Sequence, residues 1–458
     1  MLGVLAAESL TGLKYFTADK VLSPYVFVFY AAYGISFLFT PVLRHIAVHY
    51  GYIDEPDGLR KFHHTPVAYL GGVAVFLGWL SGLAISQFLT PHYIPEGMPL
   101  NRLVISFAII VAACVVVLLG LWDDVIRISP WMKITGQLGA ATCLVLGGVG
   151  QKTACVLIDP ILRRTGHYLG IPSVSPEIWM LAHPWIVTLV SIAFVFVIVI
   201  GCCNAANLMD GLDGLCGGVT AIVAAGFLFL SVHLAMSSGA VFANQDALRV
   251  VLGLALLGGV LGFVPYNFNP ASIFMGDAGS MFLGFVCALL MILFADGQHF
   301  KWFLAALVMF SLPILDTALA FVRRWVNGRP IFSPDRYHFH HQLVARGFSV
   351  KQTVIISYLL SVIFALLGAS IVFMRSRYAV AIYLVVFGSI IVAAFKMGMV
   401  HERVDLEAAR KRFMRDKPVT APLPEQLPAP EFADSPDSSR AWSESANAPE
   451  KSTTGSPS

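Results

Sequence analysis

Residues 184–215 read PWIVTLVSIAFVFVIVIGCCNAANLMDGLDGL and combine the two features that decide the fold and the site. The stretch 184–203 carries no charged side chain, and about 20 apolar residues suffice for a helix to cross the hydrocarbon core of a bilayer. A polar stretch follows at once. In it, Asp210 and Asp213 stand three residues apart, so they share one face if they lie on a helix. This segment therefore predicts a membrane span that ends in paired acids.

The composition of the whole chain agrees with a membrane protein. Of its 458 residues, 57% are hydrophobic and only 12% are charged, and the mean hydropathy is +0.75. A soluble domain carries roughly 25% charged residues, so the composition excludes a water-soluble globule of this length. The expected partner is a membrane, and we expect no nucleic-acid partner.

Apolar blocks of this kind predict an all-α integral membrane protein, a polytopic bundle of about 11 transmembrane helices. The predicted spans are 22–43, 68–90, 103–122, 132–150, 184–203, 214–236, 248–266, 278–296, 301–321, 352–374 and 378–398. Residues 1–400 form the transmembrane domain in this interpretation. From about Glu402 the chain becomes basic and then rich in Pro, Ser, Glu and Ala. Residues 401–458 are therefore predicted to be a cytoplasmic basic segment followed by a disordered tail.

The orientation of the chain follows from its basic loops. The loops after odd-numbered spans, together with the start of the tail, hold more Lys and Arg than the other side. Cytoplasmic loops of membrane proteins are enriched in these residues. An odd span count then predicts an outside N-terminus and a cytoplasmic C-terminus.

Five polar segments fall on the predicted cytoplasmic side, and they predict an active site at that face. Ionisable residues at membrane depth are costly and are therefore usually functional. The segments are 60–72, 120–137, 204–215, 267–280 and 313–343.

Five carboxylates in these segments predict a metal site. They are Asp123, Asp124, Asp210, Asp213 and Asp277. Converging acids repel one another unless a cation lies among them, and oxygen ligands without thiolate favour Mg²⁺ or Mn²⁺ over zinc. Mg²⁺ typically binds one or two protein carboxylates and fills its other positions with water and substrate phosphates. A metal-dependent site for a phosphorylated substrate follows; ordinary solvated loop acids are the alternative.

Basic and amide side chains accompany the acids. Guanidinium forks match phosphate oxygens, but basic loops are also what the positive-inside rule demands. The histidine cluster 338–341 has a stray metal site or a solvated loop as its alternatives, and the asparagines have helix caps. These alternatives stay open. The residues concerned are Lys61, Lys133, Asn204, Asn207, Asn267, Arg323, Arg324, Arg329, Arg336, His338, His340 and His341.

Four motifs carry a resemblance to a known family. They are Asp123-Asp124 with Ser129-Pro130 and Lys133, then NLMDGLDG (207–214), FMGDAGS (274–280) and GRPIFSPDRYHFHH (328–341). In this order they resemble the polyprenyl-phosphate N-acetylhexosamine-1-phosphate transferases. This family includes the bacterial undecaprenyl-phosphate GlcNAc-1-phosphate transferase, the phospho-MurNAc-pentapeptide translocase and the eukaryotic dolichyl-phosphate enzyme.

The resemblance implies an activity. A UDP-sugar and a polyprenyl phosphate would give a polyprenyl-diphospho-sugar and UMP, as the first step of a cell-envelope polysaccharide in a bacterial inner membrane. The H-x-H-H form of the last motif is more similar to the GlcNAc-1-phosphate branch than to the MurNAc-pentapeptide branch. Two departures concern Ser272, where many members of that branch have a basic residue, and Ala68, which replaces a common proline.

The resemblance also implies roles for individual residues. Asp277 and Asp123 would hold Mg²⁺, and the expected catalytic residues are Asp123, Asp124, Asp277 and His338. Substrate would be bound by Lys61, Lys133, Asn207, Asp210, Gly211, Asp213, Asn267, Phe274, Arg336, His340 and His341. A second copy of the chain, forming a homodimer, is also among the expected partners.

An ion-coupled transporter using intramembrane carboxylates is the alternative from another class. Transporters commonly place such residues near the midplane of the bilayer and show repeated halves. Here the acids gather at one end of the predicted spans, and no internal repeat is visible. A non-catalytic scaffold would not need five acids opposite a loop of histidines and arginines. The sequence therefore favours the transferase.

Overall fold

The computed structural model describes residues 17–54, 66–88, 105–155, 157–158, 182–237, 244–296, 300–328, 330 and 338–396. All of the described residues belong to one compact unit. The predicted cytoplasmic tail lies outside them, so its character remains a prediction.

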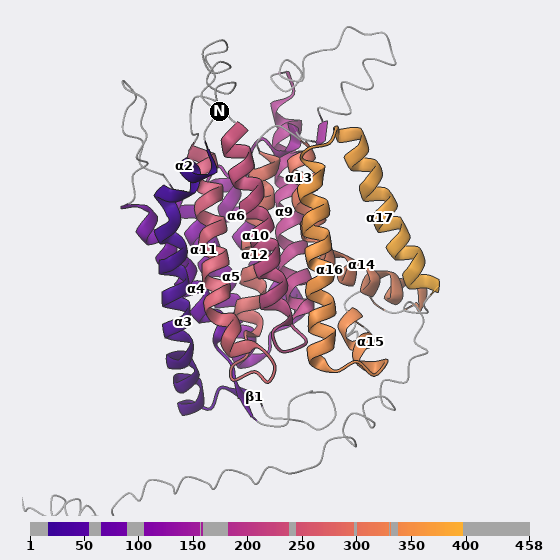
Figure 1. The fold of residues 1–458 in the computed structure, drawn as a ribbon. Helices are drawn as coiled ribbons and strands as arrows, with labels where there is room; N and C mark the ends of the chain where they lie inside the picture. Colours follow the sequence, from indigo (N-terminus) through magenta and orange to yellow (C-terminus); the bar gives the residue numbers. More distant parts are fainter. Residues whose placement is uncertain are drawn as a thin grey trace, which may run out of the picture. The chain divides into compact units, whose positions relative to one another are not determined.

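The predicted all-α architecture is confirmed for the described part of the chain (Figure 1). Its only strands are the short β1 (Ile53–Asp54) and β2 (Val67–Ala68). The helices are α2 (Ala18–Leu22), the 3-10 turn η1 (Ser23–Tyr25), α3 (Val26–His49), α4 (Gly71–Ser86), α5 (Phe107–Ile126), α6 (Pro130–Leu146), α9 (Pro184–Met209), α10 (Leu215–Ser237), α11 (Asn244–Asn267), α12 (Gly276–Ala295), α13 (Phe300–Met309), α14 (Ser311–Val326), α15 (Phe339–Ala345), α16 (Val350–Ile371) and α17 (Ser376–Lys396).

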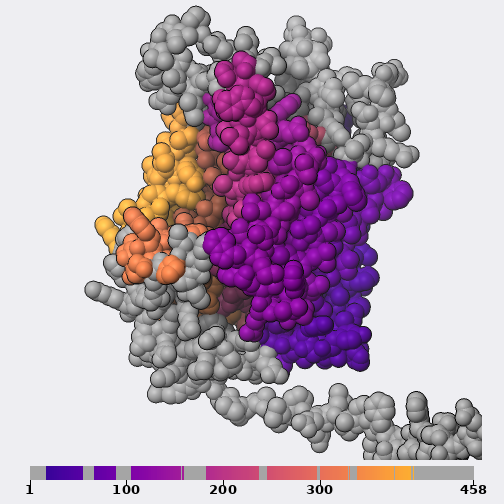
Figure 2. Space-filling view, turned by 180° about the vertical axis from the view of Figure 1, so that it is seen from behind, coloured from indigo at the N-terminus to yellow at the C-terminus, as the bar shows by residue number. Residues whose placement is uncertain are grey.

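Seven helices of the described residues are long and apolar enough to cross a membrane, and α13 with α14 would make an eighth. Each predicted span overlaps a helix, or for 301–321 the bent pair α13 and α14, but α4, α6 and the apolar part of α17 are shorter than a full span. The protein is thus a multi-pass membrane protein, while the count of eleven spans stays a prediction. Figure 2 shows α5 and α6, in purple, forming much of one face. Their outward apolar side chains, including Leu118, Trp131 and Leu146, suit contact with lipid.

Helix α12 lies at the centre of the bundle. From Ala278 to Ala295 every residue is buried, which explains why this span is apolar around its whole circumference. Small residues let its neighbours approach closely: a Cβ on Gly72 of α4 would meet the backbone of Gly279, and one on Gly120 of α5 would meet Ala278. Such contacts are typical of helices packed in membranes. They fix the depth at which α12 begins, and therefore the position of Asp277.

A short hairpin ties the start of α12 to the N-terminal half of the chain. Strands β1 and β2 pair antiparallel, with Ile53 opposite Ala68. The N–H of Phe274 donates to the carbonyl of Ala68 at 2.8 Å, and the N–H of Gly71 donates back to the carbonyl of Phe274 at 2.9 Å. Phe274 is thus held by backbone contacts on both sides, immediately before the helix that carries Asp277.

The prediction of one continuous helix over 301–321 is wrong. The chain bends by 75° between α13 and α14. Pro313 lies three residues into α14 and lacks the N–H that a continuous helix would donate to Met309, and its ring would clash with that carbonyl. The helix therefore breaks at Phe310. Figure 1 shows α14 turned away from the direction of α13 and lying close to α15.

A buried pair of amides joins α6 to α9. The side-chain N–H of Asn204 donates to Gln137 Oε1 at 2.7 Å and to the carbonyl of Ile200 at 2.8 Å. Gln137 is completely buried. Asn204 therefore does not act as a helix cap: its side chain holds two helices together, and a contact to substrate stays a prediction.

Candidate active site

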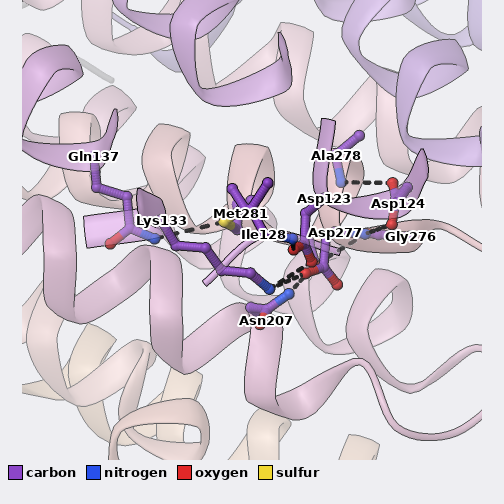
Figure 3. A network of polar contacts seen from close by, with 11 residues as sticks. Asp123, Asp124, Ile128, Lys133, Gln137, Asn207, Gly276, Asp277, Ala278 and Met281 are labelled. Atoms are coloured by element: carbon purple, nitrogen blue, oxygen red, sulfur yellow. Dashed lines mark hydrogen bonds and ion pairs between the residues drawn. The ribbon is translucent and has the colours of Figure 1, made fainter. Parts of the chain in front are cut away.

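The centre of the site is a lysine between two carboxylates (Figure 3). Lys133 Nζ lies 2.6 Å from Asp123 Oδ2 and 2.5 Å from Asp277 Oδ2. The three side chains come from the end of α5, the start of α6 and the start of α12. The turn between α5 and α6 fixes Asp123, because the N–H of Ile128 donates to its second oxygen at 2.8 Å. The structure therefore brings these three predicted residues together.

Asp124 is used differently from its neighbour. Its two oxygens accept the backbone N–H groups of Asp277 at 2.8 Å and of Ala278 at 3.1 Å. These are free donors of the first turn of α12, and an anion beside a helix N-terminus is stabilised. Asp124 thus caps α12 from another helix and fixes the position of Asp277. Its predicted catalytic role remains a prediction.

Gly276 allows this cap to form. Its φ of +72° lies in the left-handed region, and a Cβ there would lie 2.6 Å from Asp124 Oδ2. Any other residue would suffer backbone strain and would push the capping carboxylate away. This contact explains Gly276, the first glycine of the FMGDAGS motif.

The turn after α9 contains two acids with different surroundings. Asp213 Oδ2 accepts the Asn269 side chain at 2.8 Å and the N–H of Ala271 at 3.1 Å. Asn267 accepts the N–H of Gly214 at 3.1 Å and donates to the carbonyl of Ile273 at 3.0 Å. Asp213 and Asn267 therefore brace the loops that shape the site, whichever contacts they also make to substrate.

Asp210 faces a cavity of about 240 Å³. Enclosure by protein atoms raises the pKa of its carboxyl well above the usual range, and the negative charges of Asp277, Asp124 and Asp213 raise it further. An acid in this state holds a proton readily and can donate a hydrogen bond as well as accept one. The cavity is lined by Asp54, Tyr69, Asp210, Gly211, Leu212, Asp213, Asn267, Asn269, Phe274, Gly276, Asp277, His341 and Val350.

Two ionisable residues of this lining, Asp54 and Tyr69, are not among the predicted site residues. Asp54 precedes the first polar segment, 60–72, while Tyr69 lies within that segment and at the start of the predicted span 68–90. The Tyr69 hydroxyl hydrogen-bonds Asp54, and burial together with this carboxylate raises the pKa of the phenol. Asp54 is the last residue of β1 and Tyr69 directly follows β2. The available signal was an acid and a tyrosine flanking one polar loop.

Asn207 lies beside the lysine centre (Figure 3). Its side-chain N–H donates to Ser280 Oγ at 3.1 Å, and the amide also contacts the Asp277 carboxylate. Asn207 is therefore not a helix cap: it connects the end of α9 to the start of α12.

The histidine cluster packs against the Asp210 turn. His340 and His341 have ring centroids 4.2 Å apart, and His341 lines the cavity. A Cβ added at Gly211 would collide with His340 Nε2. Burial lowers the pKa of His340 well below its usual range, and the neighbouring His341 adds to the effect. His340 is therefore a neutral ring at the back of the site.

Asp316 is a third residue that the sequence analysis missed. It lies on α14, is 5% exposed, and its Oδ2 lies 3.1 Å from His338 Nδ1. The signal was a single carboxylate within an otherwise apolar stretch, PILDTALAF. Of the remaining predicted residues, Lys61, Arg329 and Arg336 lie outside the described part of the chain.

The donor set suits the predicted magnesium ion. Among the described residues, no three His, Cys, Asp or Glu side chains converge on a metal position. Two carboxylates, Asp123 and Asp277, do converge, and they already share one cation, the ammonium group of Lys133. One or two carboxylates are what Mg²⁺ usually takes from a protein, with substrate phosphates completing its shell.

Replacing Gly211 by alanine is expected to separate the Asp210 turn from α15. The added methyl group has no space beside the His340 ring, and overpacking of this kind typically costs about 1–3 kcal/mol. We expect kcat/KM for the donor substrate to fall roughly tenfold, which corresponds to about 1.4 kcal/mol. The control is Gly201→Ala, because a Cβ at Gly201 meets nothing within 4 Å. Equal activity of both variants would contradict this packing.

The fold and the site together define a class: a multi-pass membrane protein whose carboxylates gather at one end of the helices. The family model described as glycosyl transferase family 4 matches residues 106–295. These residues contain Asp123, Lys133, Asp210 and Asp277.

Named relatives extend the match. The chain is 32% identical over 333 residues to a probable undecaprenyl-phosphate N-acetylglucosaminyl 1-phosphate transferase of Bacillus subtilis, covering 72% of this chain and 80% of that protein. It is also 32% identical over 406 residues to the decaprenyl-phosphate N-acetylglucosaminephosphotransferase of Mycobacterium tuberculosis, covering 84% and 91%. Identity to the undecaprenyl-phosphate alpha-N-acetylglucosaminyl 1-phosphate transferase of Escherichia coli is 26% over 341 residues, covering 72% and 81%. The chain belongs to the family of polyprenyl-phosphate N-acetylhexosamine-1-phosphate transferases.

Proposed function

We propose that the protein transfers GlcNAc-1-phosphate from UDP-GlcNAc to undecaprenyl phosphate, giving undecaprenyl-diphospho-GlcNAc and UMP. The observation that carries the proposal is the Asp123–Lys133–Asp277 centre beside the cavity of Asp210. It stands in a membrane protein whose relatives are named for this transfer. The product would begin a cell-envelope polysaccharide. None of these observations favours an ion-coupled transporter.

The reaction needs charge neutralisation more than a base. An oxygen of the lipid phosphate attacks the β-phosphorus of the donor, and the bond from that phosphorus to the bridging oxygen breaks, so UMP leaves with the electron pair. The attacking monoester has a second pKa near 6 and is largely dianionic at neutral pH. Bringing it to an anionic diphosphate therefore requires fixed positive charge and alignment.

The residues of the centre can meet this requirement. Lys133 supplies a positive charge held in place by two carboxylates. Asp277 and Asp123 would hold Mg²⁺, which when bound would neutralise charge on the diphosphate. Asp124 fixes Asp277 by capping α12, so the spacing of the centre does not depend on the substrate.

In this proposal, different surrounding residues contact different parts of the donor substrate. Asp210, Gly211 and Phe274 would contact uridine in the cavity, with Asp213 and Asn267 bracing its wall. Asn207 would keep Asp277 oriented. The phosphates and the sugar would meet the cluster of Lys61, Arg336, His338, His340 and His341.

Asp123 acts in this scheme by positioning rather than by removing a proton. We expect Asp123→Asn to lose activity at every pH between about 6 and 9.5, the range over which the lipid phosphate completes its second ionisation. The amide keeps the shape of the carboxylate but lacks the negative charge that pairs with Lys133. The measurement is kcat of both proteins across this range. Recovery of the variant to within tenfold of wild type at alkaline pH, about 1.4 kcal/mol of barrier, would instead support base catalysis.

The site would face the cytoplasm, where UDP-sugars are made. We propose an outside N-terminus and a cytoplasmic C-terminus in a bacterial inner membrane, from the distribution of Lys and Arg between the loops.

An impermeant thiol reagent added to intact cells tests this orientation, in a background without the seven native cysteines. It is expected to label a single cysteine placed within 160–175 and not one placed within 333–337. The reverse pattern would overturn the orientation.

The function is tested by incubating purified protein with UDP-GlcNAc, undecaprenyl phosphate and Mg²⁺. We expect UMP and a GlcNAc-bearing lipid to appear in equal amounts, and neither to appear without the lipid phosphate. Release of UDP in place of UMP would show transfer of the sugar alone. No reaction with UDP-GlcNAc, but transfer from another UDP-N-acetylhexosamine, would reject the proposed sugar.

A further inference from the structure

Asp316 is a buried acid that the proposed chemistry does not yet use. It is the only carboxylate of α14, the half-helix that follows the 75° bend. Its side chain is 5% exposed. A buried charge is costly unless it is paired and hydrogen-bonded. What Asp316 contacts therefore indicates why it is there.

Both oxygens of Asp316 contact the segment that carries the histidines. Oδ1 accepts the backbone N–H of Phe339 at 2.7 Å, and Oδ2 lies 3.1 Å from His338 Nδ1. His340 Nδ1 is 3.8 Å from the same oxygen, which is too far for a hydrogen bond. One carboxylate thus holds the start of α15 through its backbone and one imidazole through its ring.

The contact to His338 fixes which ring nitrogen carries a proton. A carboxylate only accepts hydrogen bonds, so Nδ1 of His338 must be the donor. The other nitrogen, Nε2, makes no hydrogen bond to any described residue. When Nε2 also carries a proton, the carboxylate balances the charge of the ring, and Nε2–H is free to donate to an anionic oxygen.

The 75° bend between α13 and α14 determines which residues Asp316 can contact. A straight continuation of α13 would carry position 316 along the helix axis rather than across to α15. Pro313 breaks the helix, and α14 packs close to α15 (Figure 1), where Asp316 meets Phe339 and His338.

We propose that Asp316 is a positioning residue for the transfer: it accepts Nδ1–H of His338 and balances the positive charge of the ring, so that Nε2–H can donate to a phosphate oxygen of the donor. This inference rests on the proposed function, since it takes the anionic partner of His338 to be the diphosphate. Loss of the partner that orients a metal-ligating histidine typically costs about 10- to 100-fold in affinity or activity, and we expect an effect of that order for His338.

A double-mutant cycle separates this role from simple support of α15. Asp316→Asn keeps an oxygen for the N–H of Phe339 but removes the charge opposite His338. We expect kcat to fall roughly 10- to 100-fold, with a smaller change in KM for the donor. In a His338→Gln background the same substitution should cost less than about twofold, because its effect passes through the ring. An equal loss in both backgrounds would overturn the proposal.

Two further variants guard against a folding defect. Asp316→Glu and Asp316→Gln have side chains of equal length, and only the first keeps the charge. We expect Glu to retain more activity than Gln, while a purely structural contact would give equal losses. Asp296→Asn is the matched control: this half-buried acid accepts the N–H of Lys152 at 2.9 Å, away from the site, and full activity is expected.

A spectroscopic arm does not depend on turnover. In protein carrying ¹⁵N-labelled histidine, the His338 signals are assigned by their loss in His338→Gln. We expect Nδ1 of His338 to be protonated in wild type and unprotonated in Asp316→Asn. An unprotonated Nδ1 in wild type would refute the proposal. If wild type shows the expected signals but transfers no sugar phosphate, the assigned reaction fails and the Asp316–His338 contact stands.

Discussion

Replacing Asp277 by asparagine is expected to lower kcat by about 10³-fold or more, roughly 4 kcal/mol of barrier. The amide preserves the size of the side chain but cannot pair with Lys133 at 2.5 Å as a charge, nor offer a charged oxygen to a metal ion. Asparagine leaves the backbone N–H of residue 277 unchanged, so the cap from Asp124 is kept. The measurement is single-turnover transfer by purified wild type and variant.

The control for this loss is the fold of the variant. Thermal unfolding in detergent should shift little, because Asp277 is the one residue at the start of α12 that is not fully buried. A variant that is well folded and within tenfold of the wild-type rate would exclude Asp277 from the proposed metal pair.

Removal of divalent metal is expected to abolish transfer. The site brings two carboxylates together around a single lysine, and a diphosphate adds further negative charge to this space. Excess EDTA should therefore stop the reaction, and Mg²⁺ or Mn²⁺ added above the chelator should restore it. The measurement is the rate of UMP release at each step.

Calcium serves as the matched control for metal identity. Ca²⁺ is larger and prefers six to eight oxygen ligands, so we expect it to restore much less activity than Mg²⁺. Full activity in excess chelator would contradict the metal site, whatever the effect of Asp277→Asn.

Much of the centre could be predicted from the sequence because it depends on local patterns. The acids end apolar spans, so they had to lie near the ends of helices, and charges at that depth had to be paired. The sequence predicted that Asp123 and Asp277 would share a metal ion and that Lys133 would bind substrate; the structure shows both carboxylates paired with Lys133. The sequence indicated that these residues lie at one face of the membrane, but not which side chains contact each other.

The division of work among the acids could not be predicted, since it depends on packing between distant segments. Asp123 and Asp124 are adjacent, yet one contacts Lys133 and the other accepts two backbone N–H groups of α12. The sequence showed only two neighbouring carboxylates. Gly120 lets α5 approach α12 closely, and this approach decides which backbone groups of α12 Asp123 and Asp124 can reach.

The predicted span 301–321 shows a similar limit of prediction from the sequence. Its hydropathy is compatible with a straight helix, and Pro313 is tolerated within many membrane helices. Here the helix breaks, and the break brings Asp316 to His338. The proline was a signal for a bend, but the size and direction of the bend depend on what α14 packs against, chiefly α9 and α16.

The central claim, that a sugar phosphate rather than a sugar is transferred, is tested most directly by the fate of the β-phosphorus. UDP-GlcNAc labelled with ³²P at the β position is incubated with the purified protein, undecaprenyl phosphate and Mg²⁺. We predict that the label moves into the lipid fraction and that the released nucleotide is unlabelled UMP. Label that remains with the nucleotide as UDP would contradict the account.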